Sequence, residues 1–328
     1  MEITIDPRIE LVAVVQNLCN YWDNLSLRFT NEYLFSSPYK DEMTEYFRRY
    51  RSCDIIKLYN SVYEDILDIS AFIRLIVCYS NPPELHKIAD YYENYGDISS
   101  CAFPEKEFIE GLRQFYKNTQ FNEFLKRNQI EYKKMREDYG EDEEIEKVGK
   151  TIFEYLDIKN KNYTIILSSL VMGGFGISLR MKDNDIKNYM VVSPYNYKNG
   201  SYVFGPKNLI KEYLWHEISH TKINNLTKNY AEQIKKHEKT IPEKVVKQGY
   251  TNIETILNEY IIRAITLRQF EKQGEKSFME YLIDDNAKKG FTDVGLIKEF
   301  IKENGENENR FMKFDNYEEL LNYLLARI

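Results

Sequence analysis

Cysteine is scarce in this sequence, and its few copies indicate neither a disulfide framework nor a metal knuckle. The 328 residues include 4 cysteines, at Cys19, Cys53, Cys78 and Cys101. No C-x-x-C pair occurs, which argues against a zinc ribbon or a redox pair. We therefore expect free, buried thiols and a fold that depends on its hydrophobic core.

The sequence also lacks a long apolar run and a surplus of positive charge. No stretch of about 18 apolar residues could span a bilayer, and the opening MEITIDPRIELVAVV has no basic start or apolar stretch of a secretory signal. The 45 basic and 52 acidic residues give a net charge of −7, which offers no electrostatic reason to bind nucleic acid. We expect a cytoplasmic protein with no membrane span and no nucleic-acid partner. Secretion would require that a leader peptide had been removed, and the oligomeric state stays open.

What is present is a large apolar fraction arranged mainly with helical spacing. Hydrophobic residues make up 43% of the chain, enough for one large or two moderate cores. Asp6 and Pro7 predict a helix start after a short strand, and apolar residues then recur every three or four positions to about residue 157. Three β-rich runs follow between residues 162 and 196, and the remainder is again helical.

This pattern predicts an α+β fold that is mostly helical, with a small antiparallel or mixed sheet. The acidic segment 136–150 serves as a soft boundary. Residues 1–150 would form a helical N-terminal part, with a short first strand, that makes one side of a cleft. Residues 151–328 would form the catalytic part, with the sheet, a helix carrying a histidine pair and a second ligand helix.

The histidine pair lies in NLIKEYLWHEISHTKINNL, residues 208–226, which holds 2 of the 4 histidines. On a helix, His216 and His220 lie one turn apart on the same side, so one ion can bind both imidazoles. Glu217 is rotated about 100° from His216 and can reach a water on that ion, which is the geometry of an H-E-x-x-H metallohydrolase. The alternative is an amphipathic helix with two histidines on its polar surface.

A catalytic zinc takes three protein ligands, so a third must come from elsewhere in the chain. The best candidate is Glu259 in TNIETILNEYIIRAITLRQF, residues 251–270, because it lies on the polar side of a second apolar-striped helix. The other interpretation of Glu259 is a surface residue paired with Arg263 four positions later. Further candidates for the third ligand are Glu232, Glu243, Glu254 and His237.

Four segments together carry a family resemblance: DPRIEL near the start, FYKNTQFNEFLKRNQIEY, HEISH, and GYTNIETILNEYIIRA. Their combination resembles a bacterial family of zincin-like proteins classified as a domain of unknown function. The resemblance implies a gluzincin-type metallopeptidase fold with His216, His220 and Glu259 as metal ligands, and it supplies no substrate. Thermolysin-like gluzincins carry an acid four residues after the ligand glutamate, whereas this chain has Arg263 there.

Two further residues are candidates for the site. Arg263 would either steady Glu259 or bind a substrate carboxylate. Tyr250 would hydrogen-bond the developing oxyanion, although an ordinary structural tyrosine is the default among 27 copies. Glycines at 173, 174 and 176 predict either a plain hairpin or a strand edge where an extended peptide could add.

The function predicted from these residues is zinc-dependent hydrolysis of a peptide or protein substrate. Glu217 would accept a proton from the attacking water and deliver it to the leaving amine. One alternative is a non-catalytic binding module that contains zinc, and another is a regulatory protease dedicated to one protein partner. Three protein ligands with an open position would indicate catalysis, and four would indicate a closed structural site.

Overall fold

The computed structural model of the chain describes residues 1–19, 35–62, 70–91, 103–140, 143–183, 185–237, 243–246, 250, 252–307, 310–311 and 316–327. It divides into two compact units. Unit 1 comprises residues 1–142 and 162–205, and unit 2 comprises residues 143–161 and 206–328. This division differs from the single boundary near residue 150 that the sequence suggests. The predicted strands belong to the N-terminal unit because the first strand of the chain pairs with them.

Unit 1 is built on a mixed five-stranded sheet with the order β1-β3-β5-β4-β2. The first three of these strands run parallel, so that Ile3 lies opposite Ile165 and Ile165 opposite Met190. The β5–β4 and β4–β2 pairs are antiparallel. The strands are β1 (Glu2–Thr4), β2 (Ala89–Tyr91), β3 (Tyr163–Leu167), β4 (Gly174–Met181) and β5 (Ile186–Val192). A separate antiparallel hairpin pairs β6 (Asn196–Lys198) with β7 (Ser201–Val203).

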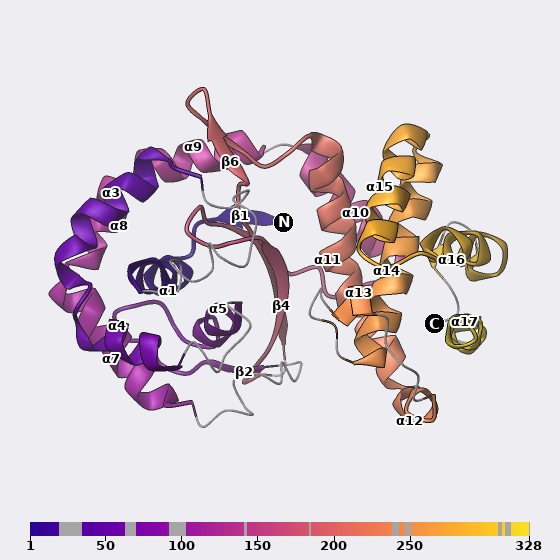
Figure 1. The fold of residues 1–328 in the computed structure, drawn as a ribbon, viewed down its shortest axis with the longest axis horizontal. Coiled ribbons are helices and arrows are strands. Elements are labelled where there is room, and N and C mark those ends of the chain that lie inside the picture. The colour runs from indigo at the N-terminus through magenta and orange to yellow at the C-terminus, as the bar shows by residue number, and fades with distance from the viewer. Residues whose placement is uncertain are drawn as a thin grey trace. The chain divides into compact units, whose positions relative to one another are not determined.

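Helix α1 (Pro7–Leu18) forms the centre of the unit 1 core. It begins as predicted, because a side-chain oxygen of Asp6 accepts a 2.9 Å hydrogen bond from the Arg8 backbone N–H. Its residues from Ile9 to Val15 are fully or almost fully buried. Figure 1 shows the reason: α1 and α5 (Ser70–Ile76) lie between the sheet and an outer arc of helices. That arc contains α3 (Pro38–Phe47), α4 (Asp54–Val62), α7 (Glu105–Asn118), α8 (Phe121–Arg127) and α9 (Gln129–Tyr139), with a 3₁₀ turn at Arg48–Tyr50.

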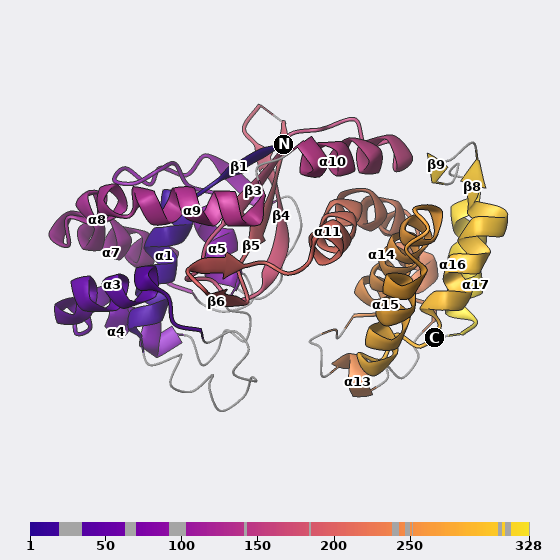
Figure 2. The ribbon, with the colours of Figure 1, turned by 90° about the horizontal axis from the view of Figure 1, so that it is seen from above.

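Unit 2 is almost entirely helical and is organised around α14 (Ile253–Lys272). This helix packs against α11 (Lys207–Lys228), α15 (Lys276–Lys288) and α16 (Val294–Phe300), as Figure 2 shows. The remaining elements are α10 (Glu143–Tyr155), α12 (Ala231–Ile234), α13 (Glu243–Val246), a π-helical turn (Ile301–Gly305), the short strands β8 (Glu306–Asn307) and β9 (Arg310–Phe311), and α17 (Tyr317–Leu325).

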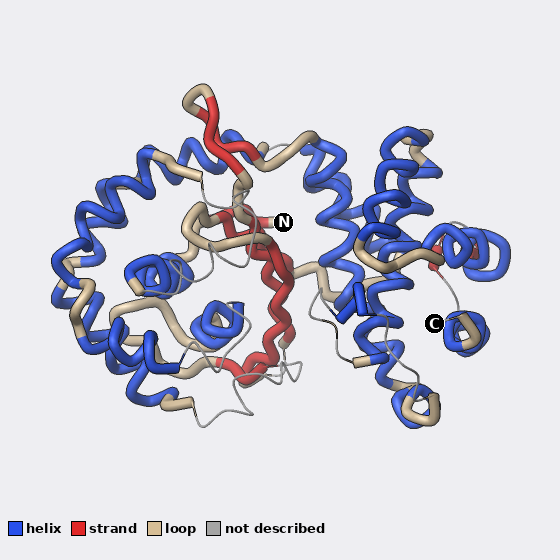
Figure 3. Tube along the Cα trace, in the orientation of Figure 1, coloured by secondary structure: helices blue, strands red, loops and turns tan. Residues whose placement is uncertain are grey.

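The described chain is mostly helix with one small mixed sheet and short hairpins, which confirms the predicted α+β class (Figure 3). Cys19 and Cys78 are buried and Cys53 is half-buried, all three as free thiols, whereas Cys101 lies outside the described residues. Among the helices of the described ranges, none combines the length and apolar character needed to cross a membrane.

Candidate metal centre

Helix α11 carries the histidine pair. It begins after Pro206, and no proline or glycine interrupts its 22 residues. Leu214 and Ile218 are buried on its core side, so the helix is fixed against the rest of unit 2. His216 and His220 lie one turn apart and remain partly exposed, by 13% and 24% of their side chains. Both imidazoles are therefore held by a packed helix and stay within reach of small solutes.

Helix α14 supplies the third side chain of the cluster. Its start is fixed by Asn252, whose side-chain oxygen accepts hydrogen bonds from the backbone N–H groups of Glu254 at 2.7 Å and Thr255 at 3.4 Å. Seven residues further on, Glu259 has a side chain that is only 4% exposed. Because α14 packs against α11, this buried carboxylate meets the two histidines.

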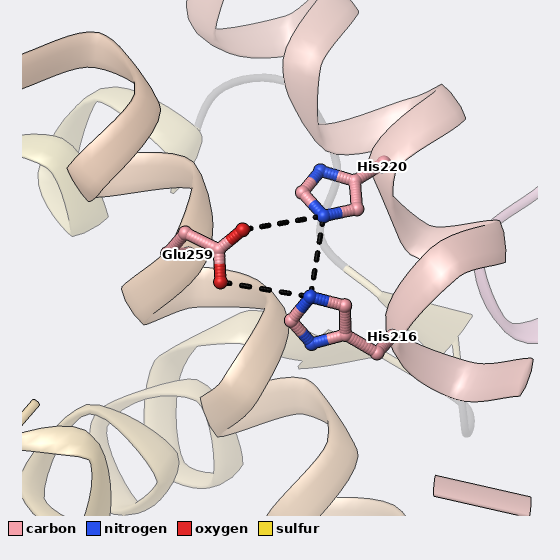
Figure 4. Close-up of side chains that lie close together, drawn as sticks. All are labelled: His216, His220 and Glu259. Carbon is pink, nitrogen blue, oxygen red and sulfur yellow. Dashed lines mark hydrogen bonds and ion pairs between the residues drawn. The ribbon is translucent and has the colours of Figure 1, made fainter. Parts of the chain in front are cut away.

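The three side chains converge on one point between the helices, as Figure 4 shows. The Nε2 atoms of His216 and His220 are 3.3 Å apart. Oε2 of Glu259 lies 3.5 Å from His216 Nε2, and Oε1 lies 3.4 Å from His220 Nε2. Among the described residues, this group meets the requirements for holding a metal ion.

The separations between these atoms fit a metal of the size of zinc. Tetrahedral coordination with bonds of about 2.0–2.2 Å places neighbouring ligand atoms roughly 3.3–3.6 Å apart. The two nitrogens are 3.3 Å apart, and their separations from the two oxygens of Glu259, 3.4 and 3.5 Å, also fall in that range. Two imidazole nitrogens and one carboxylate are also a donor set that zinc accepts.

The electrostatics of the cluster favour a cation at its centre. Burial alone would raise the pKa of Glu259, but the charges of His216 and Arg263 outweigh it and hold that pKa well below its usual range. Burial alone would lower the pKa of His220, yet the hydrogen bond and negative charge of Glu259 raise it to about 9. The carboxylate of Glu259 is therefore ionised, and its negative charge favours a cation beside the two imidazoles.

Arg263 is in direct contact with the carboxylate of Glu259. Its guanidinium donates a 2.8 Å hydrogen bond to Oε2 of Glu259 and a 2.7 Å bond to Oδ1 of Asn286 on α15. The guanidinium also lies over the ring of Phe291, 4.4 Å from its centre. These contacts on three sides fix the guanidinium and, through it, one oxygen of Glu259.

Tyr250 and Glu217 lie near the ligand cluster. Tyr250 packs edge-on against Phe291, with ring centres 5.7 Å apart, and its hydroxyl interacts with Arg263. Burial and the charge of Glu259 raise the pKa of Tyr250, so its hydroxyl keeps its proton at neutral pH. Glu217 is half-buried and forms no hydrogen bond or ion pair with the described residues. The charge of Glu217 acts on His220, and the charge of Glu259 acts on the Tyr250 hydroxyl.

Sequence reasoning missed three residues around the cluster. Asn224 lies four positions after His220 and places its Oδ1 3.2 Å from His220 Nδ1. Glu212 lies four positions before His216, and its charge interacts with that imidazole. The repeated spacing of four was the signal for both. Asn286 gave no such signal, because only the packing of α15 brings it to Arg263.

The other candidates for the third ligand do not join the described cluster. Glu232 and His237 are exposed, and Glu254 lies in the first turn of α14. The side chain of Glu243 lies outside the described residues.

The glycine-rich segment belongs to unit 1, whereas the ligand cluster belongs to unit 2. It forms the start of β4, where the Gly176 carbonyl accepts a 2.7 Å hydrogen bond from Arg74. This carbonyl is therefore already bonded, which argues against the addition of a peptide strand at that position.

Comparison with known proteins places the cluster within a single family domain. The family described as "Domain of unknown function (DUF4932)" matches residues 98–322, about two thirds of the chain, and this range includes all three ligand residues. Neither a curated protein nor a solved structure matches the chain.

Proposed function

The chain belongs to the DUF4932 family of domains of unknown function, and from the geometry of its ligand cluster we propose that it is a zinc-dependent hydrolase, most simply a peptidase. The two histidines from an H-E-x-x-H segment and a glutamate from a later helix correspond to the ligand set of gluzincins. We therefore also propose that unit 2 is zincin-like.

The observation that carries this proposal is the set of separations between the ligand atoms. The Nε2 atoms of His216 and His220 lie 3.3 Å apart, and each lies 3.4–3.5 Å from one carboxylate oxygen of Glu259. Three protein ligands meet among the described residues, so a tetrahedral ion held by them would keep one position open for water or substrate. A closed structural site would need a fourth.

Within this proposal, zinc supplies Lewis acidity, which polarises a carbonyl and lowers the pKa of a water molecule. Glu217 is the residue that moves the proton. It follows His216 directly, is half-buried, and has no ion-pair or hydrogen-bond partner among the described residues, so its carboxylate is available. It would accept a proton from the attacking water and pass it to the leaving amine.

Tyr250 is the proposed donor to the oxyanion. It retains its proton because burial and neighbouring negative charge raise its pKa. Arg263 serves a different purpose, since its guanidinium is engaged with Glu259 and Asn286. We assign it to holding the ligand carboxylate rather than to binding a substrate carboxylate.

The test is metal content followed by activity, with purified full-length protein. Elemental analysis should find about one zinc per chain in wild type and in Glu217→Gln, and a loss of zinc in His220→Ala and Glu259→Ala. A screen of peptide and protein substrates should then find hydrolysis in wild type that Glu217→Gln lowers by at least about 100-fold.

The possible outcomes separate the alternatives. A wild type that binds no zinc after zinc is added would overturn the proposal. Zinc binding without hydrolysis of any substrate, and without a fourth protein ligand, would favour a binding module or a protease dedicated to one partner. Equal hydrolysis by wild type and Glu217→Gln would remove the general-base mechanism while leaving the metal site intact.

A further inference from the structure

The two histidines belong to a longer polar row on the same face of α11. Its members, Glu212, His216, His220 and Asn224, are each four residues apart and therefore lie one above the other along the helix. Each histidine thus has one polar neighbour on its outer side. Arg263 stands where thermolysin-like gluzincins carry an acid. Other groups must therefore orient these imidazoles, and this row contains two candidates.

The contact at His220 is direct. Its Nε2 faces His216 and Glu259, and its other ring nitrogen, Nδ1, lies 3.2 Å from Oδ1 of Asn224. An amide oxygen can only accept a hydrogen bond, so Nδ1 carries the proton and donates it. When the ring gives up its second proton, as binding of a metal requires, the lone pair is on Nε2, which is the atom that faces the ligand cluster.

At His216 the neighbouring polar residue also lies on the outer side of the ring, but it is the carboxylate of Glu212 and not an amide. Figure 4 shows the second nitrogen of its ring pointing away from His220 and Glu259. Side chains on a helix lean toward its N-terminus, which brings the His216 ring over the turn that holds Glu212. Glu212 is half-buried, forms no hydrogen bond or ion pair with the described residues, and interacts with His216 through its charge.

We propose that Glu212 and Asn224 are positioning residues for the two histidines: Asn224 holds the His220 ring through its contact with Nδ1, and Glu212, one turn before His216 in the same row, acts on that imidazole through its charge. This inference rests on the metal site of the proposed function. Such partners of ligand histidines hold the ring and its tautomer and change metal affinity by about 10–100-fold when they are removed. The carboxylate of Glu212 brings a negative charge near its histidine, whereas the amide of Asn224 orients its ring through a direct contact.

The experiment compares metal binding by full-length variants, with Zn²⁺ affinity measured by chelator competition and Co²⁺ binding by absorption. Asn224→Ala and Glu212→Ala should each bind Zn²⁺ about 10–100-fold more weakly than wild type. Their Co²⁺ absorption bands should also shift, because a freed imidazole changes the ligand geometry. Asn224→Asp should restore affinity to the wild-type level or above.

Two controls use the same residue types without contact to a histidine. Asn225 is next to Asn224, but its side chain donates to the Thr221 carbonyl at 2.7 Å. Glu280 on α15 is exposed. Asn225→Ala and Glu280→Ala should bind Zn²⁺ like wild type.

The outcomes keep this inference separate from the proposed function. If wild type binds Zn²⁺ and His220→Ala does not, but Asn224→Ala and Glu212→Ala bind within about twofold of wild type, the positioning role is overturned and the metal site stands. If wild type itself binds neither Zn²⁺ nor Co²⁺, the proposed function fails and this inference fails with it. Weaker binding in Asn224→Ala that Asn224→Asp does not restore would mean that the loss is structural, which also overturns the role.

Discussion

Arg263 donates a 2.8 Å hydrogen bond to Glu259, one helical turn before it on α14, and so gives a buried ligand carboxylate a positive partner. The pair is deeply placed, with side chains exposed by only 12% and 4%. This relationship ties the stability of unit 2 to the same carboxylate that faces the two histidines.

Arg263→Met should therefore destabilise the chelator-treated protein by about 3 kcal/mol, because it removes the guanidinium from a buried carboxylate and leaves only the two histidines beside it. Excess zinc should reduce this loss, since a bound cation also compensates the charge of Glu259. The measurement is urea unfolding with chelator and with zinc.

Arg48 provides the matched control for that substitution, because it pairs with Glu45 on the surface and both side chains are 69% exposed. Arg48→Met should cost less than about 1 kcal/mol, with or without zinc. A loss in Arg263→Met as small as in Arg48→Met, or one that zinc leaves unchanged, would contradict the assigned role of Arg263.

The ligand cluster was predictable from the sequence because its geometry is mostly local. A spacing of four fixes the relation of His216 to His220 within one helix. Glu259 was selected as a residue on the polar side of a second helix, whereas the structure buries it, because α14 is covered on most of its sides. The contact between Arg263 and Asn286 was not predictable. It joins residues 23 positions apart on different helices and depends on how α15 packs.

The least predictable feature of the fold was which segments of the chain belong to which unit. The segment 1–19 was correctly interpreted, because the cap at Asp6 and a continuous apolar run are local signals. The sheet was expected to fold with the ligand helices. It belongs instead to unit 1, because β1 at residue 2 pairs in parallel with β3 near residue 164. No periodicity within a short window encodes a pairing over such a separation.

Zinc should stabilise the wild-type protein against unfolding. At a free concentration about 100 times its dissociation constant, a ligand that binds only the folded state adds about 2.7 kcal/mol. Because all three ligands lie on α11 and α14, hydrogen exchange should slow in these two helices and not in α1 of unit 1. His220→Ala should show neither effect. Equal protection of α1 and α11 on zinc addition would argue against a site confined to these two helices.

Tyr250→Phe should lower kcat by about 100-fold without loss of zinc, because it removes one donor to the oxyanion. Tyr260 is a suitable control, since its ring packs on the same Phe291 at 4.9 Å and its hydroxyl donates to the Gly290 carbonyl instead. Tyr260→Phe should retain wild-type kcat. If both substitutions reduced kcat alike, the effect would come from packing around Phe291 and not from a catalytic hydroxyl.

Glu10 in unit 1 should make stability depend on pH independently of the metal site. Its carboxyl is buried and accepts a hydrogen bond from Tyr39, whose hydroxyl is 2.9 Å from that of Tyr132. Burial raises the pKa of Glu10 from 4.5 to about 7, against the opposing hydrogen bonds of Ser168 and Tyr39.

Because the folded protein holds this proton more tightly than the unfolded chain, the contribution of Glu10 to the free energy of unfolding is complete below pH 4.5. It decreases as pH rises through about 7 and stays constant above that value. The expected loss is about 3 kcal/mol. Glu10→Gln cannot ionise and still offers an oxygen to Tyr39, so it should gain stability relative to wild type between pH 5 and pH 8.

Urea unfolding of both proteins at the two pH values measures this gain. Glu2→Gln, at an exposed position on β1, should show the wild-type pH dependence. If the difference in unfolding free energy between wild type and Glu10→Gln were the same at pH 5 and pH 8, Glu10 would have to be ionised in the folded protein over that whole range. Glu10 would then require a positive partner, and Arg8 is already engaged with Asp6 and with the carbonyls of Val77 and Tyr79.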